Sequence, residues 1–361
     1  MRISLTSARF FVTKRGMPNS SQMHPVTQAE LANALGVSQA TISMALQGLP
    51  GVSGSLRRRI ETMARKLGYH PNAGARLLSY VRHSQGTRPV QAELAWLNVW
   101  PDPAKLRTYP EFDLYWRGAF DQAMQLGYRL EEFSLSQLGS VKRVEKALQA
   151  RGIEGILLPP FGETRVDWSN FHWNQFCAVR MSRTILDPPF HLVTADQSAN
   201  TMLAVQKMRV LGYERIGFMN MIEHDPLPRL RYFLYGFLAS QFDLLHHEQV
   251  SIFDPPGGKA LKGFESWMKK ERPNALLVDG VATNLIEQAG YRIPQDIGVA
   301  LTSVQEGGHT AGILQNPKEI GRVAVSLLTS LIRDNERGIP SRMRQVLIEG
   351  EWMDGATLPM C

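Results

Sequence analysis

The sequence predicts an all-α helix-turn-helix headpiece followed by an α/β body of two Rossmann-like lobes. Two short helical patterns separated by a three-residue turn lie near the N-terminus, and apolar strands alternate with amphipathic helices after Val90. Such alternation is typical of parallel sheets with helices on both faces. A chain of 361 residues with 43% hydrophobic composition is long enough to bury a core in each part.

Positive charge is concentrated in the first quarter of the chain. Residues 1–25 carry four basic residues and no acid, and residues 26–82 carry seven basic residues against two acids. Because the whole chain has a net charge of +7, the remainder is slightly acidic at −2. A basic module on a nearly neutral body is the expected footprint of phosphate binding.

Composition also limits the class of protein. The chain has no run of about 20 apolar residues that could cross a membrane and no export signal at its start, so we expect a soluble, cytoplasmic protein. Cys177 and Cys361 are far apart and lack CxxC spacing, which argues against a disulfide framework or a usual zinc site. We expect no metal and no cofactor.

Helix signals begin at Val26. Residues 1–25 show no period and are expected to be a disordered basic arm, unless Met17 or Met23 is the true start. Thr27–Glu30 forms a capping box that opens a first helix, and Gly36 ends it. The residues expected on its buried face are Leu31, Ala34 and Leu35.

Ser38 is a good N-cap for a short second helix. Its inward positions are Ile42, Ala45 and Leu46. A third helix is expected from about Ser55 to Leu67, with Ile60, Met63, Ala64 and Leu67 buried and Gly68 as its cap. We therefore assign residues 26–71 to a helix-turn-helix domain, residues 72–89 to a hinge helix and linker, and residues 90–361 to the body.

The second helix has the properties of one that reads the major groove of double-stranded DNA. A reading helix must be short, held by a partner helix, and small or polar on its free face. The outward residues here are Gln39, Ala40, Thr41, Ser43, Met44 and Gln47. Gln39 suits an adenine edge, and Met44 or Ala40 suits a thymine methyl. The alternative is a plain three-helix bundle that binds protein.

Several residues of this region occur at spacings that mark a known headpiece. They are Val26-Thr27, Ala32, Gly36-Val37-Ser38, Thr41-Ile42-Ser43, Val52-Ser53, Arg57, Leu67-Gly68-Tyr69, Pro71-Asn72, Ala75-Arg76 and Leu78. With these residues, Val26–Arg82 resembles the headpiece of the LacI/GalR family of bacterial regulators. The resemblance implies a homodimeric repressor on operator DNA, controlled by a small-molecule effector.

By the same resemblance, Asn72–Val81 is a hinge that folds into a helix on DNA and pairs with its dimer mate in the minor groove. Leu78 falls at the family's wedge leucine, and an apolar wedge can unstack and kink a duplex; the alternative is ordinary packing beside Leu77. The expected DNA contacts are Thr27, Ser38, Gln39, Ala40, Thr41, Ser43, Met44, Gln47, Arg57, Asn72, Arg76 and Leu78.

Three features of the headpiece affect how we expect it to bind DNA. Gly74 departs from the family's helix-favouring residue and costs about 1 kcal/mol in a helix, so we expect the hinge to order less readily. Met44 stands where many relatives carry Arg or His, which predicts a different operator sequence. The run Arg57-Arg58-Arg59 is either a solvated helix face or a phosphate contact, and we favour phosphate contact for Arg57.

The body shows alternating strand and helix patterns. Strands are expected at Glu93–Val99, Ile153–Leu158, Gln175–Val179, Arg215–Asn220, Val250–Phe253, Ala275–Asp279, Gly298–Thr302 and Gln345–Ile348. Helices are expected at Asp113–Leu126, Val141–Ala150, Ala199–Leu211, Arg229–Ser240, Gly258–Lys270, Thr283–Ala289 and Pro317–Arg333. These are enough strands for two doubly wound sheets.

Ordered matches extend the resemblance to the family's effector domain, which is similar to periplasmic sugar-binding proteins. They are Arg117-Gly118, Leu126-Gly127-Tyr128, Gly155-Ile156-Leu157, Asp196, Leu211-Gly212-Tyr213, Arg215-Ile216, Gly236-Phe237, Ile293–Ile297 and Ile320-Gly321. We expect an N-lobe of about residues 92–192 and 304–330 and a C-lobe of about residues 193–303 and 331–361. The ligand is expected at the carboxyl ends of the strands.

The expected effector contacts are Trp100, Tyr109, Phe112, Asp196, Arg229, Arg231, Asp279 and Gln305. The three aromatic residues either stack on a sugar ring or belong to the core, and Asp196 matches the family's acidic residue near the cleft. Phe233 replaces the family arginine, and Thr302-Ser303 replaces the usual acidic pair. Arg229, Arg231 and Gln305 compensate for these departures, or else the chain binds a different ligand or none.

Enzyme motifs are incomplete, so we expect no catalytic residue. Pro255–Ala260 lacks the first glycine and the Ser/Thr of a phosphate loop, and Val52-Ser53-Gly54 does not complete a GxSxG elbow. His246-His247-Glu248 fits a solvated helix end better than a metal site. Two alternatives to an effector-controlled regulator are a ligand-independent repressor and a solute-binding protein, the latter lacking its export signal.

Overall fold

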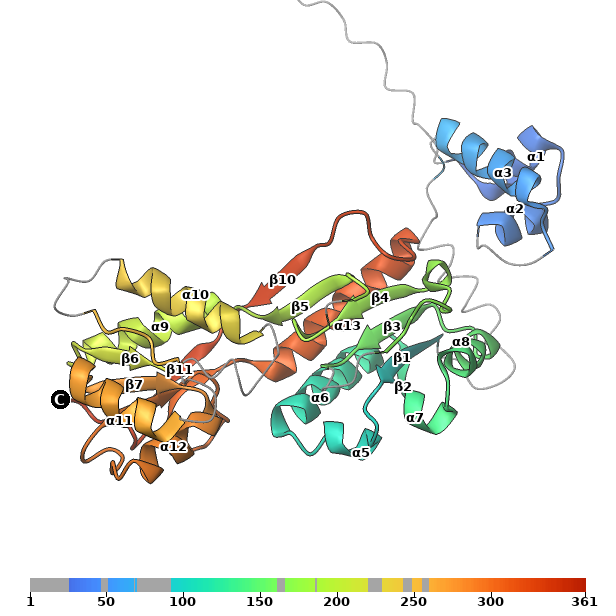
Figure 1. Cartoon of the computed structure of the whole chain (residues 1–361). Coiled ribbons are helices and arrows are strands. Elements are labelled where there is room, and N and C mark those ends of the chain that lie inside the picture. The colour runs from blue at the N-terminus through green and yellow to red at the C-terminus, as the bar shows by residue number, and fades with distance from the viewer. Residues whose placement is uncertain are drawn as a thin grey trace, which may run out of the picture. The chain divides into compact units, whose positions relative to one another are not determined.

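The computed structural model describes residues 26–46, 51–67, 69, 92–160, 166–185, 187–219, 229–242, 249–254 and 260–361. Two compact units, the headpiece within residues 1–79 and the body within residues 80–361, make up the chain (Figure 1). The expected arm, the hinge, and the contacts Gln47, Asn72, Arg76 and Leu78 lie outside the described residues, as does the side chain of Arg229.

The headpiece contains three helices around a small core. They are α1 (Gln28–Leu35), α2 (Gln39–Leu46) and α3 (Gly54–Lys66). Leu31, Ile42 and Ile60, one from each helix, are fully buried. Two expected core positions are wrong. Ala34 is exposed and Ala32 is buried instead, and Leu67 is 41% exposed because it follows the last residue of α3.

The body contains two sheets (Figure 1). The first has the order β10-β5-β4-β3-β1-β2 and is parallel throughout. Its strands are β1 (Ala92–Asn98), β2 (Tyr128–Ser134), β3 (Gly155–Leu158), β4 (Cys177–Arg180), β5 (His191–Ala195) and β10 (Gln345–Ile348). The second has the order β11-β9-β8-β7-β6, in which only β11 is antiparallel. Its strands are β6 (Ile216–Phe218), β7 (Ala275–Val278), β8 (Gly298–Leu301), β9 (Ala311–Leu314) and β11 (Glu351–Met353).

Helices accompany both sheets, as the alternating pattern predicts. They are α5 (Pro103–Leu106), α6 (Pro110–Gln125), α7 (Leu135–Leu138), α8 (Val141–Ala150), α9 (Gln197–Val210), α10 (Arg229–Gln241), α11 (Ala260–Glu271), α12 (Thr283–Gln288) and α13 (Pro317–Asp334). The seven helices expected in the body are confirmed to within a few residues at their ends. Four strands were not expected (β2, β5, β9 and β11), and the expected strand at Val250–Phe253 forms only an isolated bridge from Phe253 to Met219.

The chain crosses between the lobes at other residues than expected. Strand β9 pairs with β8, so residues 304–316 belong with the C-lobe sheet rather than the N-lobe. Strand β10 pairs with β5, and α13 packs on α6 and on β3 to β5, so residues 331–348 belong with the N-lobe. Hydrogen bonding between distant segments decides these memberships, and no local pattern in the sequence records it.

Three crossovers place the carboxyl edges of both sheets at the junction of the lobes. Strand β5 leads from the N-lobe into α9 through Asp196, strand β9 leads from the C-lobe into α13, and strand β10 leads into β11 through Glu349-Gly350. In all three, the chain changes lobe at the carboxyl end of a parallel strand. Ligands of open α/β sheets bind at such an edge.

No helix among the described residues is both long and apolar enough to span a membrane. The same residues contain no group of three or more His, Cys, Asp or Glu side chains placed to hold a metal ion.

Candidate DNA-reading and effector sites

Local capping interactions set the turn between α1 and α2. Gly36 ends α1 with a left-handed φ of 67°, and its backbone N–H donates to the carbonyl of Ala32. Ser38 then begins α2, because its Oγ accepts from the backbone N–H of Thr41 at 3.1 Å and lies 2.8 Å from the Thr41 hydroxyl. The angle between the two helices is therefore held at both ends of a three-residue turn.

The outer face of α2 is neutral and open to solvent. Gln39 and Ala40 are exposed, and Thr41, Ser43 and Met44 are half-exposed. The opposite face carries the buried side chains of Ile42 and Ala45. No charged residue occurs in the helix, so its free face offers hydrogen-bonding and methyl groups of a size that suits base edges.

Thr27 and Arg57 lie at the starts of the two neighbouring helices. The Thr27 hydroxyl accepts from the backbone N–H of Glu30 at 3.3 Å, and the Glu30 carboxylate accepts from the backbone N–H of Thr27 at 2.6 Å, which completes the expected capping box. Arg57 is half-buried in the first turns of α3, whose first turn has no acid. Ser53 caps this helix by accepting from the N–H of Leu56 at 3.3 Å.

The three predicted aromatic residues form one group at the carboxyl edge of the N-lobe sheet. The Trp100 ring centroid lies 5.7 Å from that of Tyr109 and 6.5 Å from that of Phe112. Trp100 is 9% exposed, and its indole N–H donates to the carbonyl of Pro160 at 2.8 Å. Tyr109 is 44% exposed, so it presents most of the group's accessible surface.

Asp196 lies where two crossovers meet. Its backbone N–H donates to the carbonyl of Ile348 at 2.8 Å, which joins the end of β10 to the start of α9. Its carboxylate accepts from the N–H of Ala199 at 3.0 Å and so caps α9. Of the other predicted contacts, Asp279 is half-buried at the end of β7, whereas Arg231 and Gln305 are exposed.

Phe233 and Thr302, which belong to the two departures from the family pattern, lie in buried positions, whereas Ser303 is half-buried. Phe233 is a core side chain of the C-lobe, packed with Phe218 and Phe237. Thr302 is buried just beyond β8, and its carbonyl accepts from the side-chain amide of Gln315 at 3.0 Å. Among the described residues, the Thr302 hydroxyl has no hydrogen-bond partner.

Sequence reasoning missed Arg183, which is 8% exposed and contacts both lobes. Its Nε donates to Oε1 of Gln197 at 3.3 Å in α9, and its Nη1 donates to Oε1 of Gln345 at 3.2 Å in β10. Its guanidinium carbon lies 3.6 Å from the ring centroid of Tyr232 in α10. The available signal was an arginine three residues beyond Arg180, itself the last residue of an apolar strand.

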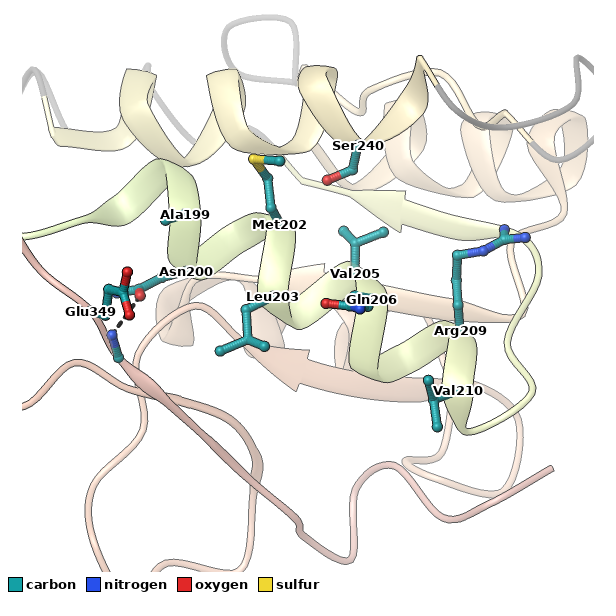
Figure 2. Close-up of a pocket in the computed structure, with 11 residues that line it drawn as sticks. Ala199, Asn200, Met202, Leu203, Val205, Gln206, Arg209, Val210, Ser240 and Glu349 are labelled. Atoms are coloured by element: carbon teal, nitrogen blue, oxygen red, sulfur yellow. Dashed lines mark hydrogen bonds between the residues drawn. The ribbon is translucent and has the colours of Figure 1, made fainter. Parts of the chain in front are cut away.

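A surface groove of about 800 Å³ lies elsewhere, along α9 (Figure 2). Its lining residues are Ala199, Asn200, Met202, Leu203, Val205, Gln206, Arg209, Val210, Ser240, Glu349 and Gly350. The described effector candidates are all absent from this lining. The groove is therefore lined by other residues than the predicted effector contacts, although its Ala199 donates its backbone N–H to the Asp196 carboxylate.

Comparison with known proteins bears on both units. Residues 27–72 match the family model described as bacterial regulatory proteins, lacI family. The chain is 44% identical over 297 residues to the HTH-type transcriptional regulator AglR of Rhizobium meliloti (strain 1021), covering 76% of this chain and 77% of that protein. The chain belongs to the LacI family. It is also 24% identical to the HTH-type transcriptional regulator KdgR of Bacillus subtilis (strain 168), over 87% of this chain and 93% of that protein.

Solved structures of the family share the fold. A CelR–cellobiose complex aligns with a TM-score of 0.54 at 16% identity, covering 92% of this chain and 99% of that one. A lac repressor dimer bound to operator and the anti-inducer ONPF aligns with a TM-score of 0.51 at 17% identity, covering 93% and 100%. The predicted family and fold class are confirmed: this LacI-family chain is a DNA-binding transcription regulator. By name, the relatives cited here are regulators and not enzymes.

Proposed function

We propose that this LacI-family regulator is a homodimeric repressor that binds a two-fold symmetric operator and responds to a small-molecule effector, of the sugar class, bound between its lobes. The observation that carries the DNA part is the neutral, open face of α2, held at a set angle by Gly36 and Ser38. The chain then acts on DNA in the cytoplasm, with no catalytic step and no cofactor.

In the major groove, α2 reads base edges. Gln39 pairs with an adenine edge, and Ala40 and Met44 contact thymine methyl groups. The predicted contacts Ser38, Thr41, Ser43 and Gln47 supply hydroxyl and amide groups to phosphates and bases, and Thr27 lies at the start of α1 as a further contact. The half-burial of Met44 supports a role in which the thioether is covered on binding.

Arg57 binds a DNA phosphate. A cation near the N-terminus of a helix is disfavoured by the helix dipole, and the first turn of α3 has no acid that would offset it. A phosphate placed at this end of the helix is stabilised by the dipole and by the guanidinium together. Asn72, Arg76 and Leu78 extend the contact into the minor groove, with Leu78 as the wedge.

The effector binds where the carboxyl edges of the two sheets meet. Tyr109, Trp100 and Phe112 offer ring faces from the N-lobe, and the unpartnered Thr302 hydroxyl supports a polar contact from the C-lobe. Asp196 and Asp279 offer acceptors, and Arg229, Arg231 and Gln305 offer donors. An effector changes operator affinity only if it binds the two arrangements of the lobes differently.

Relatives support an effector of the sugar class. One structural neighbour is a cellobiose complex, another from Enterococcus faecium has bound ribose, and a curated relative is the ribose operon repressor of Haemophilus influenzae. Phe233 and Thr302, which replace charged family residues, favour a ligand specific to this chain.

The second candidate function is a ligand-independent repressor. Calorimetry of the full chain against a sugar panel separates the two, since silence across the panel favours the second.

The DNA proposal is tested by selecting bound sequences from a random duplex pool. Two half-sites about one helical turn apart require a symmetric site of roughly 14–20 base pairs. Gln39→Ala is expected to relax one position of each half-site by about 1–3 kcal/mol, while Asn33→Ala, exposed on α1, leaves the selected site unchanged. A pool without a shared sequence contradicts the proposal.

The wedge is tested by comparing specific with non-specific DNA. Leu78→Ala is expected to weaken operator binding more than binding to random duplex, because only the operator complex contains the kinked base step. Leu77→Ala is the matched control. Equal losses on both kinds of DNA would show that Leu78 is an ordinary packing residue.

A further inference from the structure

Arg183 is a buried cation whose hydrogen-bond acceptors are all neutral. Among the described residues, no carboxylate lies within 4.0 Å of its guanidinium. Asp196 attracts this charge from a greater distance while its carboxylate caps α9. Since buried charges in proteins are normally paired, a cation whose acceptors are all uncharged side chains, Gln197, Gln345 and the Tyr232 hydroxyl, indicates a missing anion.

The existing contacts hold Arg183 in position without satisfying its charge. The amide oxygens of Gln197 and Gln345 accept at 3.3 and 3.2 Å, longer than the roughly 2.7–2.9 Å typical of a charge-assisted bond to an anion. Tyr232 lies against the flat face of the guanidinium at 3.6 Å. Because stacking covers the face and not the edge, the N–H groups that do not donate to Gln197 or Gln345 remain directed outward in the plane.

Electrostatics agree with this geometry. Burial lowers the pKa of Arg183 below its ordinary value, although a guanidinium stays protonated in proteins. Burial also lowers the pKa of Arg180, and the charge of Arg183 lowers it further. Two neighbouring buried cations therefore repel each other here, and an anion would stabilise both.

Arg183 also lies at the effector edge. It follows β4, and Trp100 follows β1, two strands away in the same sheet and thus about 10 Å along the edge. Its contacts in α9, α10 and β10 come from both lobes. An anion bound to Arg183 would therefore lie at the junction of the two lobes, where the effector is proposed to bind.

We propose that the effector carries a carboxylate or phosphate group and that Arg183, stacked on Tyr232 and oriented by Gln197 and Gln345, binds it. This inference rests on the proposed effector cleft and adds the chemical class of its ligand. Phe233 and Thr302 occupy the positions where the family carries charge, and Arg183 places a cation on the opposite lobe.

Thermal unfolding of the full chain tests the assignment with three probes: inorganic phosphate, D-glucuronate and neutral D-glucose. Ionic strength is held constant with KCl, because surface charges also respond to salt. A ligand that binds only the folded state raises Tm. We expect either phosphate or glucuronate to raise Tm and glucose to leave it unchanged. Which of the two anions raises Tm shows whether the bound group is a phosphate or a carboxylate.

Variants assign the effect to the residue. Arg183→Gln is expected to weaken binding of the responding anion by at least about tenfold, the loss of a charged hydrogen bond. Arg183→Lys keeps the charge and retains part of the response, and Tyr232→Phe keeps the ring and retains most of it. Arg333→Gln, an exposed arginine paired with Asp334, is the control that behaves as the unmodified chain.

Three outcomes overturn the inference. Neither anion raises Tm, or the anion raises the Tm of Arg183→Gln as much as that of the unmodified chain, or glucose raises Tm as much as the anion does. Operator binding is measured on the same samples without ligand. A glucose response with intact operator binding leaves the proposed repressor standing and removes only the anionic effector. If the unmodified chain without ligand does not bind operator DNA, the proposed repressor function itself is contradicted.

Discussion

Gly118→Ala tests how closely α6 and α13 pack in the N-lobe. A Cβ on Gly118 would lie 1.8 Å from the carbonyl oxygen of Lys318 and 2.7 Å from its carbonyl carbon. The contact is reciprocal, because a Cβ on Gly321 would lie 2.0 Å from the carbonyl oxygen of Tyr115. Both obstacles are backbone atoms, which cannot rotate away as a side chain would.

The cost follows from the separation that the methyl group imposes. A carbon atom normally approaches a carbonyl oxygen no closer than about 3.3 Å, so the helices must move apart by about 1.5 Å. Both helices contribute to one buried cluster that includes Ala119, Ile320 and Ala324, so the movement also loosens this core. Overpacking costs about 1–3 kcal/mol or more, and with backbone on both sides we expect about 3 kcal/mol.

Thermal unfolding of the purified chain measures this loss. About 3 kcal/mol corresponds to a fall in Tm of about 6–12 °C for a body of this size. Gly280→Ala is the matched control, since a Cβ there has nothing within 4 Å and its φ is not in the left-handed region. If Gly118→Ala unfolds within about a degree of Gly280→Ala, the close packing of the two helices is refuted.

Three further changes test local features. Thr27→Ala removes the capping-box hydroxyl and should cost the headpiece about 1 kcal/mol in urea unfolding, and an unchanged midpoint would contradict the cap. Gly36→Ala places a Cβ at a φ of 67° and should cost about 1–2 kcal/mol by the same assay, although the site has open space. His191→Asn tests a pH effect. Burial lowers the pKa of His191 below 6.5, so the neutral ring stabilises the fold above pH 6.5, and that contribution is lost as the pH falls through the lowered pKa. The variant keeps an acceptor for the N–H of Arg344, and its Tm should fall less than that of the unmodified chain between pH 7.5 and pH 5.5; an equal fall removes His191 as the cause.

Local signals predicted the headpiece well because its structure is local. The capping box at Thr27, the left-handed Gly36 and the N-cap Ser38 act within four residues of themselves, and each has the expected role. The wrong prediction at Ala34 is also a local one, displaced by two residues from the buried Ala32. The α1 face turns by about 100° per residue, and the core lies nearer Ala32 than the apolar spacing indicated.

In the body, local sequence signals failed to predict four of the strands and one buried arginine. Strand β5 was missed although all five of its residues are buried, because a short apolar run next to Pro188 and Pro189 carries no period. Strand β2 carries charged residues at the sheet edge, which hid its pattern. Arg183 was missed because its significance depends on Gln345, 162 residues away in sequence.

The sequence by itself determined the family, the helix-turn-helix and the alternation of strands and helices, since these depend on short-range spacing and side-chain chemistry. Only the tertiary structure decided which sheet receives β9 and β10, how closely Gly118 approaches Lys318, and which side chains surround Arg183. The physical reason is that strand pairing, packing and desolvation are properties of segments brought together from far apart, and no local pattern carries that information.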